Sequence, residues 1–488
     1  MLHRRPKMCA LRRLGSLAAM AGLAAVLAGC SGSSTVATGG TGTIHVSLTD
    51  PPSCAFPHGQ FEHVYVTIRS VQAHINGAAG DNSFGWQELT PQLNSNPMQI
   101  DLFAAGPNSC LLAMLGSNAA LPAGNYQQLR LLLVPNDGGG GPLPAPNRCA
   151  GHGFNCAELH DGSIHELLLS SQANTGLKIP PGQIVGGPIS VDSGEVVDLN
   201  IDFNACASIV QQGNGEYRLK PALTAGQVST SDTSISGQVV DATTQQPIVG
   251  GTVLVALEQQ DGTGADVILQ QTAADSSGRF RFCPLSTGMT FDVVAVAING
   301  AGVAYNATVA AGVPSGTNLG TIPLNAETGS ATGPATLQGF VTAKTNSSAA
   351  TIDASVFALQ TISLGGGVTR PVTIPARSSS TPNISVESDA SCPPDPPASA
   401  NCAQYTLIEP ASNPRVGIFS AGSISYSLPS PGDVLYSVRA DAHVPLSGGV
   451  STCTPSSKTT SLDANGDPLK ANPSATVTPA EIDFSGCS

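Results

Sequence analysis

The sequence predicts an all-β protein: an N-terminal antiparallel β-sandwich or barrel-like domain, followed by one or two small β-sandwiches. Three observations favour this class. Glycine (54) and proline (37) exceed average usage, charged residues are only 11% of the chain, and short apolar–polar alternations recur between turn residues. Long helices favour Leu, Glu and Lys in continuous runs, and the shortage of charge argues against them. The formal charge of −13 excludes a basic nucleic-acid-binding protein.

Residues 1–29 are expected to be a lipoprotein signal peptide. Basic residues precede an apolar stretch, Leu14 to Leu27, that is too short for a comfortable membrane span. The stretch runs into Leu-Ala-Gly and then Cys30, the bacterial lipobox pattern, in which the cysteine thiol accepts diacylglycerol. An ordinary secretory signal with an incidental cysteine is the alternative. Either Met1 or Met8 starts the chain.

Cleavage before Cys30 would leave residues 30–42 as the lipidated cysteine and a flexible tether. It would remove five basic and no acidic residues, which changes the formal charge from −13 to −18. Anionic lipid would repel so acidic a body, so the lipid chains would hold the protein at the membrane. The expected location is the bacterial cell envelope, on the outer membrane of a Gram-negative species, facing the periplasm or the cell surface.

Cysteine usage fits an oxidising compartment. Of twelve cysteines, Cys9 would leave with the signal and Cys30 would be acylated, and an even number in an exported protein predicts disulfides. The ten candidates are Cys54, Cys110, Cys149, Cys156, Cys206, Cys283, Cys392, Cys402, Cys453 and Cys487. Connectivity does not follow from the sequence. Our pairing hypothesis is Cys54–Cys110, Cys149–Cys156, Cys392–Cys402 and Cys453–Cys487, with Cys206 and Cys283 left over for a bridge between domains.

One cysteine cluster also has the ligand types that zinc prefers. It consists of Cys149, His152, Cys156 and His160. The spacing matches no common zinc module, and the expected compartment favours a small disulfide loop. No metal or other cofactor is therefore expected.

The first domain is expected over residues 43–225. Residues 43–50 and 61–75 alternate apolar and polar side chains, as half-buried strands do. Further strands are expected at residues 98–103, 126–134, 165–169 and 196–203, and the best short helix is Leu111–Leu115. The blocks TIHVSLTDPP, FEHVYVTIRSVQAHI and LPAGNYQQLRLLL, in this order, resemble a bacterial exported family, domain of unknown function 4382. That resemblance implies no established activity and no catalytic residues.

Two further β-modules are expected after the first domain. In residues 234–324, the blocks ISGQVVD, QPIVGGTVLV and GRFRF resemble the carboxypeptidase regulatory-like family, a transthyretin-like β-sandwich. The resemblance implies a spacer or adhesion unit without a peptidase site. Residues 325–335 are expected to be a linker, and residues 336–488 a degenerate second sandwich with a Pro-rich insert at residues 378–403.

No complete catalytic motif is present, and the G-x-S-x-G nucleophile elbow is missing. The histidines at positions 45, 63 and 74 fall on expected strands, where a half-exposed histidine is the commoner explanation. Trp86, the single tryptophan, is expected in a core rather than on a sugar-stacking platform.

Four polar side chains occur at every second position along, and just after, the expected strand at residues 196–203. Asp198, Asn200, Asp202 and Asn204 would share one face of the sheet. Such a face has oxygen ligands for a cation, but a solvated sheet face is favoured.

The predicted function is that of a membrane-anchored, exported lipoprotein that acts as a non-catalytic binding, adhesion or structural module of the envelope. The alternatives are an exported hydrolase with β-sandwich accessory modules and a carbohydrate-binding protein. The expected partners are the membrane, through the N-terminal lipid, and an envelope or extracellular protein or a glycan. Nucleic acid is not expected.

Overall fold

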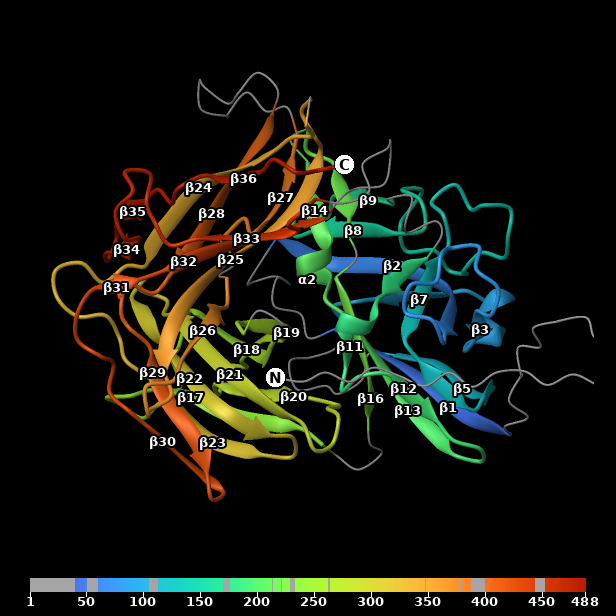
Figure 1. The fold of residues 1–488 in the computed structure, drawn as a ribbon, viewed down its shortest axis with the longest axis horizontal. Coiled ribbons are helices and arrows are strands. Elements are labelled where there is room, and N and C mark those ends of the chain that lie inside the picture. Colours follow the sequence, from blue (N-terminus) through green and yellow to red (C-terminus); the bar gives the residue numbers. More distant parts are fainter. Residues whose placement is uncertain are drawn as a thin grey trace, which may run out of the picture. The chain divides into compact units, whose positions relative to one another are not determined.

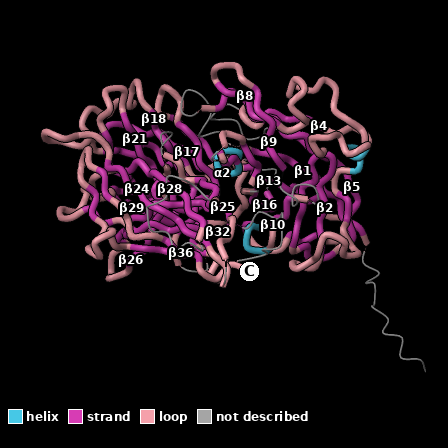
Figure 2. The backbone as a smooth tube through the Cα atoms, turned by 90° about the horizontal axis from the view of Figure 1, so that it is seen from above, coloured by secondary structure: helices cyan, strands magenta, loops and turns pink. Residues whose placement is uncertain are grey.

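The computed structural model describes residues 40–50, 60–104, 113–169, 176–212, 214–220, 222–228, 233–261, 264–346, 348–376, 380–387, 400–443 and 453–488. The predicted signal peptide, Cys30 and nearly all of the predicted tether lie outside them, as do Cys54, Cys110 and Cys392. Strands make up most of the described residues, and the prediction of an all-β protein is confirmed (Figure 2). The helices found among these residues are too short to cross a membrane.

The first region, up to residue 228, consists of two main sheets around one apolar core. Alternation places Ile44, Val46 and Leu48 of the first strand inside this core, fully buried. One sheet contains, in spatial order, β11 (Ile184–Val185), β16 (Leu223–Val228), β13 (Val196–Phe203), β1 (Thr41–Thr49) and β5 (Ala113–Pro122). The β1–β13 pair is parallel, so this sheet is mixed and not purely antiparallel.

The second sheet of the first region centres on the long strand β2 (Phe61–His74). Its other strands are β10 (Leu177–Ile179), β7 (Gln128–Leu133), β8 (Cys156–Leu159), β9 (Ile164–Leu169), β15 (Tyr217–Leu219), β14 (Ile209–Gln211), β3 (Gln87–Glu88) and β4 (Met98–Asp101). A small ribbon and three helical turns complete the region: β12 (Ile189–Val191), β6 (Gly124–Tyr126), η1 (Pro91–Asn94), η2 (Pro181–Gln183) and α2 (Ala205–Ser208).

The predicted helix Leu111–Leu115 is wrong where the structure describes it. Strand β5 already begins at Ala113, and it pairs with β1 up to Pro122. The apolar run was too short to distinguish a helix from a buried strand, and pairing with a neighbouring strand decided the outcome.

The second region, residues 233–324, packs two sheets face to face. The smaller sheet contains β20 (Arg279–Phe282), β17 (Ile235–Asp241) and β23 (Asn318–Leu324). The larger contains β19 (Asp266–Ala273), β18 (Thr252–Gln260), β21 (Thr290–Ile298), β22 (Ala304–Pro314), β29 (Arg415–Ser420) and β30 (Ser423–Tyr426). The hairpin β29–β30 thus comes from the far C-terminal part of the sequence and joins β22 in parallel (Figure 1).

The third region, residues 335–488, forms further sheets. One contains β28 (Asn401–Glu409), β24 (Ala335–Ala343), β35 (Thr476–Val477) and β36 (Ile482–Phe484). A second sheet contains β26 (Thr369–Ile374), β25 (Ile352–Ser363), β27 (Asn383–Val386), β32 (Ser437–His443) and β33 (Ser457–Thr460). A separate two-stranded ribbon pairs β31 (Val434–Leu435) with β34 (Lys470–Ala471).

The larger sheet of the second region has two buried faces. Val255 and Leu257 of β18 point into the core beneath β17, whereas Leu254, just before them, lies in the core of the third region. Such double burial explains why this strand is a nearly continuous apolar run. The second and third regions therefore share one sheet, and residues 40–488 form one compact unit.

Candidate functional site

The most polar part of the first region's interior is a ladder of side chains between β1 and β13. The parallel register places His45 opposite Asp198, Ser47 opposite Asn200, and Thr49 opposite Asp202. The two side chains of each pair are in hydrogen-bond contact. His45 Nδ1 lies 2.9 Å from Asp198 Oδ1. Ser47 Oγ donates to Asn200 Oδ1 (3.0 Å), and Thr49 Oγ1 donates to Asp202 Oδ1 (3.1 Å). Asn200 Nδ2 also donates to Thr49 Oγ1 (3.0 Å), which links two rungs.

The ladder corrects the interpretation of this strand as a solvated face. Asn200 and Asp202 are buried, because β1 covers their flank with its own hydroxyls and the second region lies beyond them. Asn204 leaves the strand and caps α2, where its Oδ1 accepts from the backbone N–H of Ala207 (2.9 Å).

Two carboxyl groups end the ladder in a nonpolar environment. Burial raises the pKa of Asp202 to about 7. Burial, reinforced by the charge of Asp202, also raises the pKa of Asp50 well above its ordinary value, although the backbone N–H of Ala205 donates to it (3.3 Å). Both groups are therefore held toward their protonated forms, in which they can donate as well as accept hydrogen bonds.

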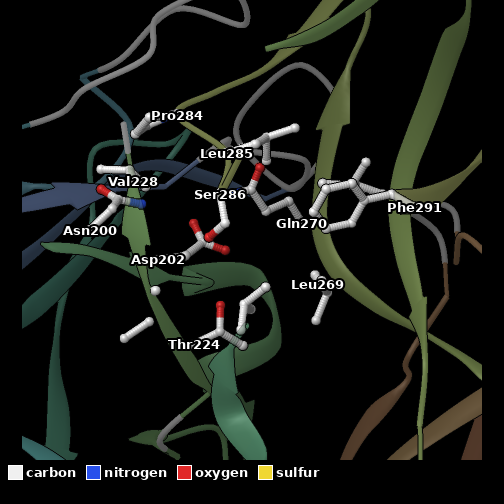
Figure 3. A pocket seen from close by; sticks show the side chains of 14 residues that line it. Asn200, Asp202, Thr224, Val228, Leu269, Gln270, Pro284, Leu285, Ser286 and Phe291 are labelled. Atoms are coloured by element: carbon white, nitrogen blue, oxygen red, sulfur yellow. The ribbon is translucent and has the colours of Figure 1, made fainter. Parts of the chain in front are cut away.

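Asp202 borders a cavity of about 40 Å³ between the first and second regions. Figure 3 shows its side chain beside Ser286, with Gln270 and Phe291 reaching in from the second region. Ligand pockets are typically about 300–1,000 Å³, whereas this cavity has room for about two or three waters. The arrangement suits a hydrated, hydrogen-bonded junction between regions rather than a site for an organic substrate.

A second, open cavity of about 550 Å³ lies along the hairpin β29–β30. Serine hydroxyls dominate its lining, with Ser420, Ser423 and Ser425 contributed by the hairpin and Leu364 by the loop after β25. Its lining residues include Tyr426 but no histidine and no carboxylate.

The structure joins Cys149 to Cys156 and Cys453 to Cys487, two pairs of the pairing hypothesis. Cys206, Cys283 and Cys402 are also disulfide-bonded. Cys54, Cys110 and Cys392 lie outside the described residues, so the remaining pairs stay predictions.

The candidate zinc ligands do not form a metal site in this arrangement. The sulfurs of Cys149 and Cys156 bond to each other and are not available as thiolates. His160 instead faces Glu62, with 3.2 Å between Nδ1 and Oε2. Across the described ranges, no group of three or more histidine, cysteine or carboxylate side chains is arranged to hold a metal ion.

The strand histidines have polar partners, and the half-exposed interpretation holds for His45 and His63 but not for His74. His63 Nδ1 lies 2.7 Å from Asp101 Oδ2 across the β2–β4 pair. His74 is buried, and its Nε2 lies 2.8 Å from the carbonyl oxygen of Phe84. These contacts fix strand and loop positions.

Trp86 is neither in the core nor on an open platform. The guanidinium carbon of Arg130 lies 4.1 Å from its ring centroid, and the His74 ring meets it edge-on at 5.1 Å. The indole N–H donates to the carbonyl of Gly80 (3.1 Å). Because Arg130 covers a face of the indole, a sugar cannot stack there without displacing it.

Replacing Arg130 by alanine should uncover this indole. We expect a loss of about 1 kcal/mol in the free energy of unfolding and a shift of tryptophan emission to longer wavelength. Since the chain has one tryptophan, the emission spectrum reports on this site alone. The exposed Arg148→Ala is the matched control and should leave the spectrum unchanged. An unshifted spectrum for Arg130→Ala would show that the guanidinium does not cover the ring.

Partly buried arginines join the regions to one another. Arg218 of the first region pairs with Asp353 of the third, with the two side chains 13% and 5% exposed. Arg370 of the third region pairs with Asp266 (3.1 Å) and Asp292 of the second. Arg439 of the third region likewise forms an ion pair with Asp261 of the second region (2.7 Å). None of these pairs was predicted, because their partners lie far apart in the sequence.

Residues 41–221 match the model of a family described as a domain of unknown function (DUF4382). The matched residues run from β1 to the end of β15, which confirms the resemblance found for the first region. No curated protein matches the chain.

Solved structures similar to this chain include a candidate adhesin and pilins. A candidate adhesin from Bacteroides ovatus is 11% identical, with 53% of this chain and 94% of that chain covered and a TM-score of 0.15. A minor pilin of Streptococcus agalactiae is 9% identical (52% and 96% covered, TM-score 0.16). The shaft pilin SpaA of Lactobacillus rhamnosus GG is 11% identical (60% and 99%, TM-score 0.17). At these TM-scores the superpositions support no inference about function.

Proposed function

We propose that the chain is a lipid-anchored protein of the bacterial cell envelope whose β-body serves as a non-catalytic binding, adhesion or structural module. One observation carries the proposal: three β-regions are joined into a single body by a shared sheet and by buried ion pairs between regions. Accessory modules of an enzyme can fold and move independently, so they do not need a shared sheet or ion pairs between regions. A body that transmits or resists force needs such links. The resemblance of residues 234–324 to carboxypeptidase regulatory-like modules belongs to the same proposal.

The anchor in this proposal is Cys30. Its place after Leu-Ala-Gly and an apolar stretch supports lipidation, and the acidic charge of the remaining chain supports an anchor of lipid rather than of basic side chains. The body would begin at β1, about ten residues further on, so the tether would hold it close to the membrane.

Replacing Cys30 by alanine tests the anchor. We expect the variant to lose labelling by radioactive palmitate and to move from the membrane fraction to the soluble fraction, or to remain unprocessed. Cys9→Ala is the matched control, because that cysteine would leave with the signal peptide, and it should behave as the unaltered chain. Unchanged membrane association of Cys30→Ala would contradict the proposal.

The non-catalytic role needs a separate measurement on the full-length chain. A glycan array and a set of purified envelope proteins serve as probes, followed by assay of each bound probe for turnover. Saturable binding that leaves the probe intact supports the proposal. Hydrolysis of a bound probe, lost on replacing a carboxylate or histidine, would overturn it in favour of the exported hydrolase.

A further inference from the structure

A buried amine of the first region lies against a side-chain amide of the third. Lys220, which directly follows β15, is only 3% exposed. Its Nζ lies 3.0 Å from Oδ1 of Asn383 on β27, and it also donates to Oγ of Ser355 on β25. The two partners face each other across the antiparallel β25–β27 pair. The amine and the amide thus meet inside a packed junction, 163 positions apart in the sequence.

The environment favours the neutral form of this amine. Burial lowers the pKa of Lys220 to about 8, even though the charges of Asp353 and Asp441 oppose the change. A desolvated, partly deprotonated lysine has a free electron pair on Nζ and is a nucleophile at neutral pH. A surface lysine such as Lys178, which pairs with Asp81 at 2.6 Å, has no comparable burial.

The amide is held in one orientation. Ser355 Oγ donates to Asn383 Oδ1 (3.1 Å), and Asn383 Nδ2 donates to the backbone carbonyl of Cys206 (3.0 Å). Donors aimed at Oδ1 withdraw electrons from the attached carbon, Cγ, and stabilise negative charge that develops on the oxygen. The carbon is one bond from an oxygen that already contacts Nζ, so the atoms that would react are near neighbours.

A carboxyl group completes the cluster. Asp353 is opposite Ser385 in the register and two positions before Ser355, so it belongs to the same face of β25. It is 3% exposed, and burial raises its pKa despite the ion pair with Arg218. A buried carboxyl of this kind can take a proton from an attacking amine and pass it to a leaving group.

We propose that Lys220 and Asn383 are joined by an intramolecular isopeptide bond that forms without any other enzyme. The bond from Nζ to Cγ forms as Nζ attacks the carbonyl carbon, and the bond from Cγ to Nδ2 breaks. A proton from Nζ passes to Nδ2, with Asp353 as the carrier, and Nδ2 leaves as ammonia. One amine and one primary amide become one secondary amide and one ammonia, so no oxidant, reductant or co-reactant is needed.

The bond would lock the first region to the third. Arg218 and Lys220 lie at the same junction, where hydrogen bonds and the ion pair with Asp353 also join the two regions. A covalent bond there would keep the junction closed under pulling forces that separate non-covalent contacts. The inference does not depend on the lipid anchor, since it concerns residues of the folded body alone.

Peptide mapping of the full-length chain tests the bond directly. After tryptic digestion, we expect a branched peptide in which the segment containing Lys220 is attached to the segment containing Asn383, lighter than their sum by one ammonia. Recovery of both segments only as separate linear peptides, with their masses unaltered, would overturn the proposal. This readout uses the unaltered protein and does not depend on any variant.

Variants then assign the roles. Lys220→Arg, which keeps the positive charge, and Asn383→Ala should each abolish the branched peptide, whereas the surface Lys178→Arg should retain it. Asp353→Ala should lower the branched fraction formed in a given time by roughly a hundredfold, as expected for loss of a proton carrier. Undiminished branching in folded Asp353→Ala would remove Asp353 from the mechanism, and branching in Lys220→Arg would show that another lysine reacts.

Discussion

Replacing Arg370 by methionine should lower the free energy of unfolding by about 3–5 kcal/mol at about pH 8, because it leaves buried carboxyl groups without their cation as they ionise. Arg370 is 18% exposed and faces Asp266 and Asp292, which are 1% and 5% exposed. Glu258 is fully buried in the same cluster and accepts a hydrogen bond from the backbone N–H of Thr373 (3.1 Å). Methionine keeps most of the apolar stem of arginine, so the loss reports the charge and not the packing.

The loss should depend on pH in a defined direction. Burial raises the pKa of Asp266 to about 8 and that of Glu258 well above its ordinary value. The charge of Arg370 lowers both values, so without it they rise further. As pH increases, the folded variant then keeps protons that the folded unaltered chain releases, and its stability falls more. We therefore expect the difference between Arg370→Met and the unaltered chain to be larger at about pH 8 than at about pH 5.

Urea unfolding at both pH values measures this difference. Arg279 on β20 is exposed, so Arg279→Met is the matched control. It should change the free energy of unfolding by less than about 0.5 kcal/mol. Adding Asp266→Asn and Asp292→Asn to Arg370→Met should restore most of the lost stability, because the neutral amides need no cation. A loss that is equal at both pH values, and that these amides do not restore, would mean that the ion pairs contribute little.

Local patterns in the sequence predicted the strands of the first region well. The alternation in residues 61–75 became β2, and residues 196–203 became β13 with the same bounds. Alternation succeeds here because each strand has one face on a core, and period-two burial leaves a direct trace in the sequence. The failure at Leu111–Leu115 fits the same logic, because a short run that is apolar throughout carries no period.

The contacts between regions could not be predicted from one sequence. Arg218 and Asp353 are 135 positions apart, and no local pattern relates them. The hairpin β29–β30 completes a sheet whose other strands end at Pro314, about one hundred residues earlier. The ladder between β1 and β13 shows what a single sequence cannot predict. Alternation along the strand shows that Asn200 and Asp202 share one face of the sheet. It does not show that the hydroxyl groups of β1 cover that face.

Replacing Asp202 by asparagine should stabilise the protein at alkaline pH by up to about 4 kcal/mol, and hardly at all at acidic pH. Burial raises the pKa of this carboxyl to about 7, so between the ordinary pKa of an aspartate and pH 7 the folded state keeps a proton that the unfolded state releases. The folded state therefore loses stability as pH rises through this window, and above it carries a buried charge. Asparagine has nearly the same shape and never ionises.

The hydrogen bonds of the ladder can survive this change. Thr49 Oγ1 donates to Asp202 Oδ1, and an asparagine oxygen accepts the same bond. The added N–H₂ group would face the hydrated cavity beside Ser286, where a water or a hydroxyl can accept from it. The predicted gain thus comes from the charge and not from a new contact.

Because Asp50, Glu258 and Asp266 also have raised pKa values, the unaltered chain loses stability with rising pH for several reasons. The difference between the chain and its Asp202→Asn variant reports on this carboxyl together with its effect on Asp50, so both proteins are unfolded with urea across the pH range. Asp198→Asn, two rungs along and paired with His45, is the matched control and should change stability by less than about 1 kcal/mol. A pH-independent difference for Asp202→Asn would mean that Asp202 ionises normally in the folded protein. The junction between the first and second regions would then tolerate a buried negative charge, and water in the cavity would have to solvate it.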